Sequence, residues 1–424
     1  MSKTALPPTS AILIGVVLIA AITVAAVAVW ALRPHGELGS GLPDTFTYRV
    51  DEYTAVAPEL LRWREVQAIP AGLAQPRALA LGADDEMFVA GDRAVVSFNA
   101  EGEPLGRIDL DAEPRRLAIA AQDHARPGRL YVVFRTHVEV YRTDGTRETA
   151  WPHFDTGAAL TGIALAADTV FVADAGRRIV LRCDLDGKVL SELGRRDEER
   201  EIPGFVIPSP YFDLTLGPDG LLRVVNPGRH RIEYYTQEGR LELPLIWGRA
   251  GVAIDGFCGC CNPASIALLP DGRMVTAEKG ILRVKVYTEQ GELQSVVVGP
   301  AELAPTPEAM VETRTDYRLR APMVAVDSRA RVLVLDPASG AVRIFEEIQQ
   351  PCRPRRRPRP AAIGCARRPA PRRWEPSEAG RLCCLPKMPA SGQATARVPK
   401  PVPAARFSTI ALCRIAPRRN PRRV

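Results

Sequence analysis

A unit of about 40 residues recurs along the chain and limits the fold more than any other feature. Its clearest copy is residues 260–300, which read CCNPASIALLPDGRMVTAEKGILRVKVYTEQGELQSVVVGP. Apolar residues alternate with polar ones in four short runs, and turn residues separate the runs. A repeated four-stranded meander of this length is typical of a β-propeller blade.

The third run of this copy shows the alternation most plainly. Leu282, Val284 and Val286 occupy every second position, and Arg283 and Lys285 stand between them. Successive side chains of a strand point to opposite faces of the sheet. We therefore expect one apolar face and one charged face on this strand.

Six copies can be aligned on the residues just before the innermost strand, where proline is frequent. These starts are Gln75-Pro76-Arg77, Glu113-Pro114-Arg115, Leu160-Thr161-Gly162, Ser209-Pro210-Tyr211, Asn262-Pro263-Ala264 and Ala321-Pro322-Met323. In five copies a glycine marks the turn into the outer strand, at Gly102, Gly145, Gly187, Gly239 and Gly291.

The sixth copy lacks this turn and ends after three strands, at Phe345. Its open edge has to be covered, and the segment from Leu60 to Ile69, which precedes the first copy, can supply the missing strand. We therefore predict six blades, closed by pairing of the two ends of the domain. The alternative is a seventh, degenerate copy between Arg195 and Pro208 or between Ala301 and Arg320.

These copies resemble NHL repeats. The match is visible in residues 160–179 (LTGIALAADTVFVADAGRRI) and 216–232 (LGPDGLLRVVNPGRHRI), and it extends roughly from Leu60 to Glu347. The resemblance implies an all-β, six-bladed, NHL-type propeller of a bacterial, membrane-anchored protein. It implies no single activity, since NHL propellers include lyases, RNA binders, scaffolds and extracellular sensors.

Residues 11–32 contain no charged side chain. As a helix rising about 1.5 Å per residue they would cross the roughly 30 Å hydrocarbon layer of a membrane. Lys3 precedes the segment, and Trp30 lies where an interfacial aromatic residue is expected. A cleaved signal peptide is the alternative, although its apolar core usually has only about 7 to 15 residues.

We therefore expect a short tail (1–10), a single transmembrane anchor (11–32), a linker (33–58) and a propeller (59–350). The anchor would hold the protein in the cell membrane with the propeller outside the cytoplasm.

Residues 351–424 form an Arg/Pro-rich tail of different composition. From Cys352 onward there are 17 Arg and 2 Lys against 2 Glu, whereas the rest of the chain holds 37 basic and 47 acidic residues. The tail shows no sustained apolar period, which predicts disorder. It is either a polybasic arm for acidic lipid or nucleic acid or the product of a frameshift in a GC-rich gene. Because the propeller itself is acidic, we do not expect nucleic acid as its partner.

Residues 255–263 (DGFCGCCNP), here called the Cys loop, carry Cys258, Cys260 and Cys261. Cys258 and Cys261 have the C-x-x-C spacing, which suits a disulfide, a dithiol redox pair or two thiolate ligands of one metal ion. Asn262 stands where covalent haem attachment would require histidine. The cofactor expected here is thus a thiolate-bound metal or none. The other propeller cysteine, Cys183, is expected in the core.

The remaining candidate binding residues flank the starts of the blades, on the face where these connections converge. They are Arg77, Arg116, Tyr211, Asn262 and Arg320. With Arg115, the arginines either form an anion-binding ring at the mouth of the channel or merely solvate it. The partner would be a protein or a small-molecule ligand.

Four polar residues occupy equivalent positions after the second strands of their blades: Asp174, Asn226, Glu278 and Asp336. Such residues usually cap a turn with their side chains. Their repetition indicates a structural role.

Catalytic signatures are lacking in the sequence. The five histidines form no H-E-x-x-H motif, and neither a G-x-S-x-G elbow nor a Gly-rich phosphate loop is present. We therefore expect an extracytoplasmic binding or scaffold module, and favour a role other than an enzyme. A metal or thiol-redox protein using the Cys loop is the first alternative, and a divalent-metal lyase or lactonase-like hydrolase is the second.

Overall fold

The computed structural model of the chain describes residues 17–24, 53–259, 261–303 and 321–348. The strands of this part lie in one compact unit, Met1–Arg353. They form six antiparallel sheets, five with four strands and one with three. Each sheet is one blade.

The strands of a blade follow one another in chain order from the channel outward. Blade one contains β2 (Pro76–Leu81), β3 (Met87–Gly91), β4 (Ala94–Phe98) and β5 (Pro104–Asp109). Blade two contains β6 (Arg116–Ile119), β7 (Leu130–Val133), β8 (Val138–Tyr141) and β9 (Arg147–Ala150). Blade three contains β10 (Leu160–Leu165), β11 (Val170–Asp174), β12 (Ile179–Cys183) and β13 (Val189–Leu193). Blade four contains β14 (Leu214–Leu216), β15 (Leu222–Asn226) and β16 (Arg231–Tyr235). Blade five contains β17 (Ser265–Leu268), β18 (Met274–Glu278), β19 (Arg283–Tyr287) and β20 (Leu293–Val298). Blade six contains β21 (Met323–Val326), β22 (Val332–Asp336), β23 (Ala341–Glu347) and, from the other end of the domain, β1 (Trp63–Pro70).

The innermost strands surround a central channel. β2, β6, β10, β14, β17 and β21 contact one another in this order, and β21 returns to β2. The prediction of a six-bladed propeller is confirmed. The first proposed place for a seventh blade, residues 195–208, holds one isolated bridge between Asp197 and Ile202 and no strand. Most of the second place, residues 304–320, lies outside the described residues.

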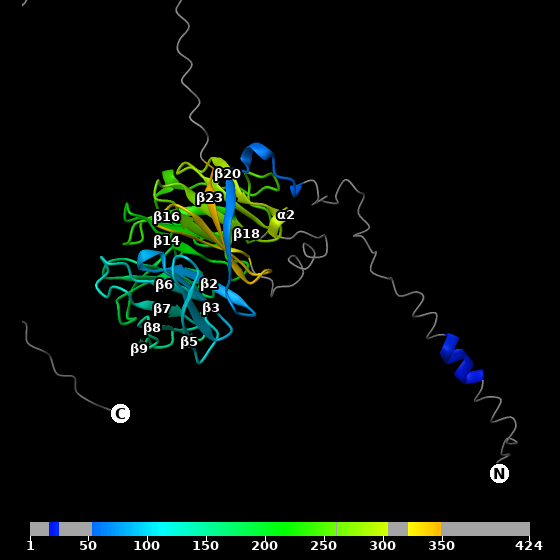
Figure 1. The fold of residues 1–424 in the computed structure, drawn as a ribbon, viewed down its shortest axis with the longest axis horizontal. Helices are drawn as coiled ribbons and strands as arrows, with labels where there is room; N and C mark the ends of the chain where they lie inside the picture. The colour runs from blue at the N-terminus through cyan, green and yellow to red at the C-terminus, as the bar shows by residue number, and fades with distance from the viewer. Residues whose placement is uncertain (1–16, 25–52, 260, 304–320, 349–424) are drawn as a thin grey trace, which may run out of the picture. The chain divides into compact units, whose positions relative to one another are not determined.

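The ring closes where β1 pairs with β23. Trp63 lies opposite Glu347 and Pro70 opposite Ala341, and Figure 1 shows the blue β1 beside the orange β23. The Trp63 indole donates a hydrogen bond of 3.0 Å to the Ser295 hydroxyl on blade five. The predicted closure is confirmed, but the strand begins later than Leu60 because η3 (Pro58–Leu60) is a 3-10 turn.

Apolar side chains between neighbouring blades form the core. Val133 and Val138 of blade two, for example, share one buried cluster with Val172 and Leu181 of blade three. The middle strands are therefore covered on both faces. In β18 and β19 every residue is buried.

The charged face expected on β19 is itself buried. The side chains of Arg283 and Lys285 are both 0% exposed. The Cys loop and the chain before it supply their covering. The charged face of β19 therefore supports a loop from below.

Tryptophan packing explains two of the turn glycines. Gly187 and Gly291 have φ of +87° and +81°, in the region that favours glycine. A Cβ on Gly187 would lie 2.4 Å from the Trp151 ring, and one on Gly291 would lie 2.5 Å from the Trp247 ring. Each turn thus closes against an aromatic side chain with no room for a methyl group.

Blade four departs from the repeat. Gly239 makes the expected turn with φ of +92°, but no regular outer strand follows it in the described chain. Two isolated bridges, Tyr235–Leu241 and Ile232–Trp247, line the edge instead. The 3-10 turn η6 (Leu243–Leu245) lies between them and interrupts the strand.

Residues 17–24 are helical. In the part of the chain that the structure describes, no helix has the length and apolar character needed to cross a membrane. Most of the expected anchor (11–32), most of the linker (33–58) and the tail (351–424) lie outside the described residues.

Candidate functional site

The connections into the innermost strands bring distant residues together around a cavity of about 140 Å³, here called the mouth cavity. Every first strand starts at this end of the channel, so the residue just before or after each start faces the same space. The lining comprises Arg77, Arg115, Arg116, Thr161, Pro210, Tyr211, Phe212, Ala264, Ala321, Pro322 and Met323.

Three of the five predicted binding residues, Arg77, Arg116 and Tyr211, line this cavity. Arg320 lies outside the described residues. Asn262 does not line the cavity and is fully buried.

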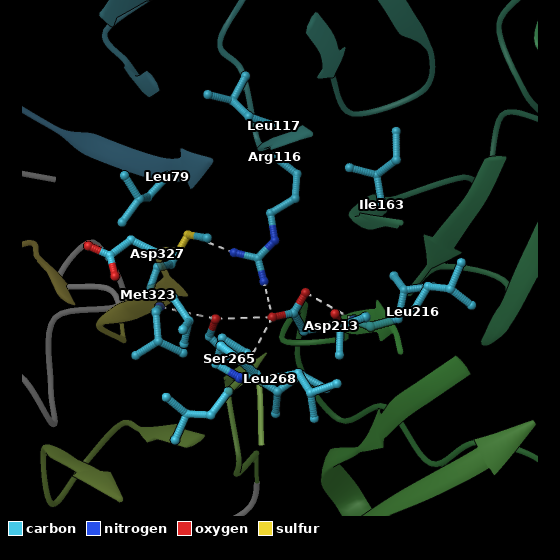
Figure 2. A pocket seen from close by; sticks show the side chains of 18 of the residues that line it. Leu79, Arg116, Leu117, Ile163, Asp213, Leu216, Ser265, Leu268, Met323 and Asp327 are labelled. Atoms are coloured by element: carbon cyan, nitrogen blue, oxygen red, sulfur yellow. Dashed lines mark hydrogen bonds and ion pairs between the residues drawn. The ribbon is translucent and has the colours of Figure 1, made fainter. Parts of the chain in front are cut away.

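An ion pair between Arg116 and Asp213 lies at the inner end of the mouth cavity, here called its floor. Arg116 is 8% exposed and Asp213 is 5% exposed. Figure 2 shows the Asp213 carboxylate between the Arg116 guanidinium and the Ser265 hydroxyl, which donates to it at 3.0 Å. The backbone N–H of Ile266 also donates to this carboxylate, at 3.1 Å.

Beneath this floor lies a second cavity of about 420 Å³, the channel chamber. Arg116 and Met323 line both cavities, and Figure 2 shows aliphatic residues such as Leu79, Ile163 and Leu268 around the chamber. The Arg116–Asp213 ion pair therefore lies where the two cavities adjoin.

Positive charge dominates the mouth cavity. Arg77 pairs with Glu113 at 2.7 Å and donates to the Gln75 side chain at 3.1 Å. Arg115 makes no ion pair or side-chain hydrogen bond with any described residue. Burial lowers the pKa of Arg115, and the nearby guanidinium groups of Arg135 and Arg77 lower it further.

Two turns between second and third strands bring further cations to this face. Arg135 follows β7 and interacts electrostatically with Arg115. Lys279 follows β18, and its ammonium lies 4.6 Å from the centre of the Tyr211 ring, within cation–π range. Neither residue is apparent in the sequence when the blades are aligned on their first strands. Aligning the residues after each second strand would have found them.

The four equivalent polar residues have the structural role that their repetition indicated. The Asp174 carboxylate accepts the backbone N–H of Ala159, and the Asn226 amide oxygen accepts that of Val206. Glu278 reaches farther and accepts the N–H of Cys258 at 3.2 Å. In these three blades the side chain after the second strand thus holds the loop that leads into the blade.

Glu278, Arg283 and Lys285 form a buried charge cluster under the Cys loop. All three are 0% exposed. Glu278 accepts from Arg283 at 2.9 Å and pairs with Lys285 at 2.5 Å. The cluster therefore contains two cations and one carboxylate, and backbone carbonyl groups of the loop supply the remaining acceptors.

Lys285 donates to the carbonyl oxygens of Ile254 and Gly256 at 2.9 and 2.8 Å. Its ammonium also lies 4.7 Å from the Phe257 ring centre. Burial lowers the Lys285 pKa to about 8, against the raising effect of Glu278. The loop depends on a cation that is costly to keep charged.

Asn262 joins the Cys loop to the turn after β18. Its amide donates to the carbonyl oxygen of Lys279 at 2.9 Å, and its oxygen accepts the Lys279 N–H, also at 2.9 Å. The same amide donates to the carbonyl oxygen of Cys258. The Asn262 side chain therefore supports the loop from inside.

Of the loop cysteines, Cys258 is half-buried, Cys261 is buried, and Cys260 lies outside the described residues. The disulfide, redox and metal interpretations therefore all stay predictions. Cys183 is buried in β12 as expected, and burial raises its pKa to about 12. The described residues contain no group of three or more His, Cys, Asp or Glu that could hold a metal ion.

Beside the Cys loop lies an apolar cavity of about 700 Å³, whose lining includes His230, Phe257, Cys258 and Lys279. The His230 ring nitrogen Nε2 forms a hydrogen bond with the carbonyl group of Gly259. The structure thus places an imidazole next to a loop where the sequence offered only sulfur ligands.

No family model matches the chain, and no curated protein matches it. Among solved structures, the selenomethionine-substituted virginiamycin B lyase from Staphylococcus aureus is 14% identical, with 65% of this chain and 82% of that chain covered and a TM-score of 0.43. A streptogramin B lyase structure is 12% identical, with 69% and 100% covered and a TM-score of 0.46. A catalytically inactive virginiamycin B lyase from Staphylococcus aureus with quinupristin is 15% identical, with 68% and 89% covered and a TM-score of 0.44. These similarities carry no conclusion about a ligand or a reaction of this chain.

Proposed function

We propose that this chain is a membrane-anchored, extracytoplasmic binding module of the NHL type, and that it takes its ligand in the mouth cavity. One observation carries the proposal: Arg77, Arg115, Arg116 and Tyr211, from three different blades, line one cavity. Binding sites commonly lie on loops that a rigid scaffold positions.

The chemistry of the floor favours binding over catalysis. The Ser265 hydroxyl donates to Asp213, whose carboxylate already accepts from Arg116 and the Ile266 N–H. Nucleophilic catalysis requires a base that is available to take the hydroxyl proton. In this network the carboxylate is already paired with the Arg116 guanidinium and accepts from the Ile266 N–H, so it is not a base reserved for the hydroxyl.

A blocked cavity tests where the ligand binds. Thr161→Trp would place an indole in the mouth cavity, whereas Thr146→Trp adds the same group on an exposed turn of blade two. The full-length protein is screened by thermal shift against small carboxylates, phosphates, amines, sugars and short peptides. A ligand that stabilises the wild type and Thr146→Trp but not Thr161→Trp would support the site. An equal shift in both variants would contradict it.

The anchor is tested separately from the ligand site. Residues 11–32 would keep the protein in the membrane fraction after carbonate extraction, and a chain lacking them would be released. A protease added outside intact spheroplasts would degrade the propeller. Protection from that protease would place the propeller on the cytoplasmic side and overturn this part of the proposal.

A second candidate function rests on the contact between His230 and the Cys loop. Imidazole and thiolate are the usual ligands of zinc in proteins, so this loop is a candidate metal or thiol-redox site. Intact mass of the protein under native and denaturing conditions, without reductant, separates the possibilities. Extra native mass that is lost in Cys258→Ser but retained in the core variant Cys183→Ser would support a metal. A mass lower by two hydrogens, with nothing bound, would indicate a disulfide.

A further inference from the structure

The charges that touch the mouth cavity do not balance. Arg77, Arg115 and Arg116 line it, Arg135 interacts electrostatically with Arg115, and Lys279 lies over the ring of the lining residue Tyr211. The carboxylates that pair with these five cations are Glu113 and Asp213. The described part of the cavity therefore carries excess positive charge.

Two of the three lining arginines already form ion pairs within the protein. The Arg116 guanidinium is held by Asp213 in the floor, and the Arg77 guanidinium is held by Glu113 and Gln75. Even so, the Arg77 side chain is only 8% exposed, and its buried Nε has no hydrogen-bond partner among the described residues. An unpartnered donor on a buried guanidinium is costly, and an acceptor entering the cavity would satisfy it.

Arg115 is the cation that a ligand can neutralise. It is half-buried on the cavity wall and makes no ion pair or side-chain hydrogen bond with a described residue, and Glu113, which attracts it, is paired with Arg77. Arg135 and Arg77 lie close enough to repel it. A guanidinium offers a planar fork of N–H donors that matches a carboxylate.

The other lining residues favour a ligand that has an apolar part as well as a charge. Pro210, Ala264, Pro322 and Met323 supply apolar walls, and the Tyr211 ring supplies an aromatic one. The cavity has a volume of about 140 Å³, well above the roughly 10 to 15 Å³ that one water molecule needs on the same measure. This space admits a few carbon atoms beside one anionic group.

We propose that the mouth cavity binds a small organic carboxylate, with its carboxylate on Arg115 and its short apolar body against Tyr211 and Met323. This inference rests on the proposed function, since it names the ligand class of the same cavity. Lys279 contacts the Tyr211 ring and adds positive potential on that side. Arg116 stays paired with Asp213 when the ligand binds.

Matched probes test the charge and the apolar body independently. Propionate, propionamide, propylamine and inorganic phosphate are titrated into full-length wild type and into Arg115→Gln, Arg115→Lys and Arg107→Gln. Arg107 lies on exposed β5 and pairs with Asp109, so its replacement is the control for the loss of one positive charge. Binding is measured by calorimetry at low and moderate salt.

We expect propionate to bind the wild type and Arg107→Gln equally. Arg115→Gln should weaken binding about 10- to 100-fold, the range for loss of a charge-assisted hydrogen bond. Arg115→Lys should restore part of the affinity, because a lysine keeps the charge but not the fork. Propionamide, propylamine and phosphate should bind more weakly than propionate.

Each contrary result has a distinct meaning. No saturation by propionate at about 10 mM, ten times a Kd of 1 mM, would overturn the inference, as would unchanged affinity in Arg115→Gln. If phosphate binds as tightly as propionate, the apolar wall does not contribute to binding, and that part of the inference is overturned. If propionamide binds better and Thr161→Trp abolishes its binding, the carboxylate inference fails while the proposed function stands.

Discussion

The mouth cavity and the Cys loop lie on the same face of the propeller, and both depend on arginine and lysine side chains. At the Cys loop the cations are fully buried, and Glu278 and loop carbonyl groups pair with them. At the mouth cavity Arg115 is half-buried, and the structure describes no partner for its side chain. The same residue types therefore hold a loop in one place and are available to a ligand in the other.

Stability should respond most strongly to loss of the carboxylate in the buried charge cluster. Glu278→Ala leaves Arg283 and Lys285 buried without their counterion, which should lower the free energy of unfolding by about 3 to 5 kcal/mol. The control Glu192→Ala breaks half-exposed ion pairs with Arg177 and Arg195 and should cost about 0 to 1 kcal/mol. Both changes are measured by urea denaturation. If Glu278→Ala lowers the free energy of unfolding by less than 1 kcal/mol, the buried cations of the Cys loop do not depend on their counterion, and the contrast with the mouth cavity fails.

The sequence predicts the architecture well because the blade repeat is local. Alternating strands, turn glycines such as Gly291, and the missing outer strand of blade six are each visible within one repeat. The closing pair β1–β23 follows from the need to cover one edge. The outer edge of blade four was mispredicted, since its Gly239 turn is intact while the residues after it form a 3-10 turn.

The sites were harder to predict because they depend on contacts between blades. Arg283 and Lys285 alternate with valines like any solvated face, and nothing nearby in sequence shows that a loop some 30 residues upstream covers them. Asn262 adjoins a blade start, yet its side chain turns inward to Lys279. Arg77, Arg116 and Tyr211 line one cavity because the propeller symmetry itself brings the blade starts together.

The pH dependence of stability should reveal the lowered pKa of the buried Lys285. The Lys285 pKa lies at about 8 in the folded protein, below its ordinary value of 10.5. Between these values the unfolded chain holds a proton that the folded protein has lost, so raising the pH favours folding by about 1.4 kcal/mol per unit. The burial penalty is fully present below about pH 8 and is relieved by about pH 10.5.

The variant Lys285→Met should lack this rise between pH 8 and 10.5, whereas Lys188→Met, which removes an exposed lysine, should keep it. The measurement is the free energy of unfolding in urea at half-unit pH intervals. Identical pH profiles for the wild type and Lys285→Met would show that Lys285 keeps an ordinary pKa despite its burial.

A smaller loss of stability should follow when the hydrogen bonds between Asn262 and Lys279 are removed, because they connect the Cys loop to the mouth cavity. Asn262→Ala leaves the N–H and the carbonyl group of Lys279 without their partners, at a cost of about 1 to 3 kcal/mol. Asn99→Ala removes comparable side-chain hydrogen bonds from an exposed turn, where water replaces them, and should cost less. Because Lys279 contacts Tyr211, Asn262→Ala should also weaken propionate binding slightly. Equal costs for the two variants would argue against a special role of Asn262.

Arg115→Gln should have the smallest effect on folding. No described residue loses a hydrogen bond or an ion pair when this guanidinium is removed, and its repulsion with Arg135 and Arg77 is relieved. The free energy of unfolding should therefore change by less than about 0.5 kcal/mol, or increase slightly, in the same urea measurement. Added propionate should stabilise the wild type but not Arg115→Gln, because a ligand that binds only the folded state raises its stability. A loss of more than 1 kcal/mol without ligand would mean that Arg115 supports the fold as Arg283 does, and the contrast between the two regions would disappear.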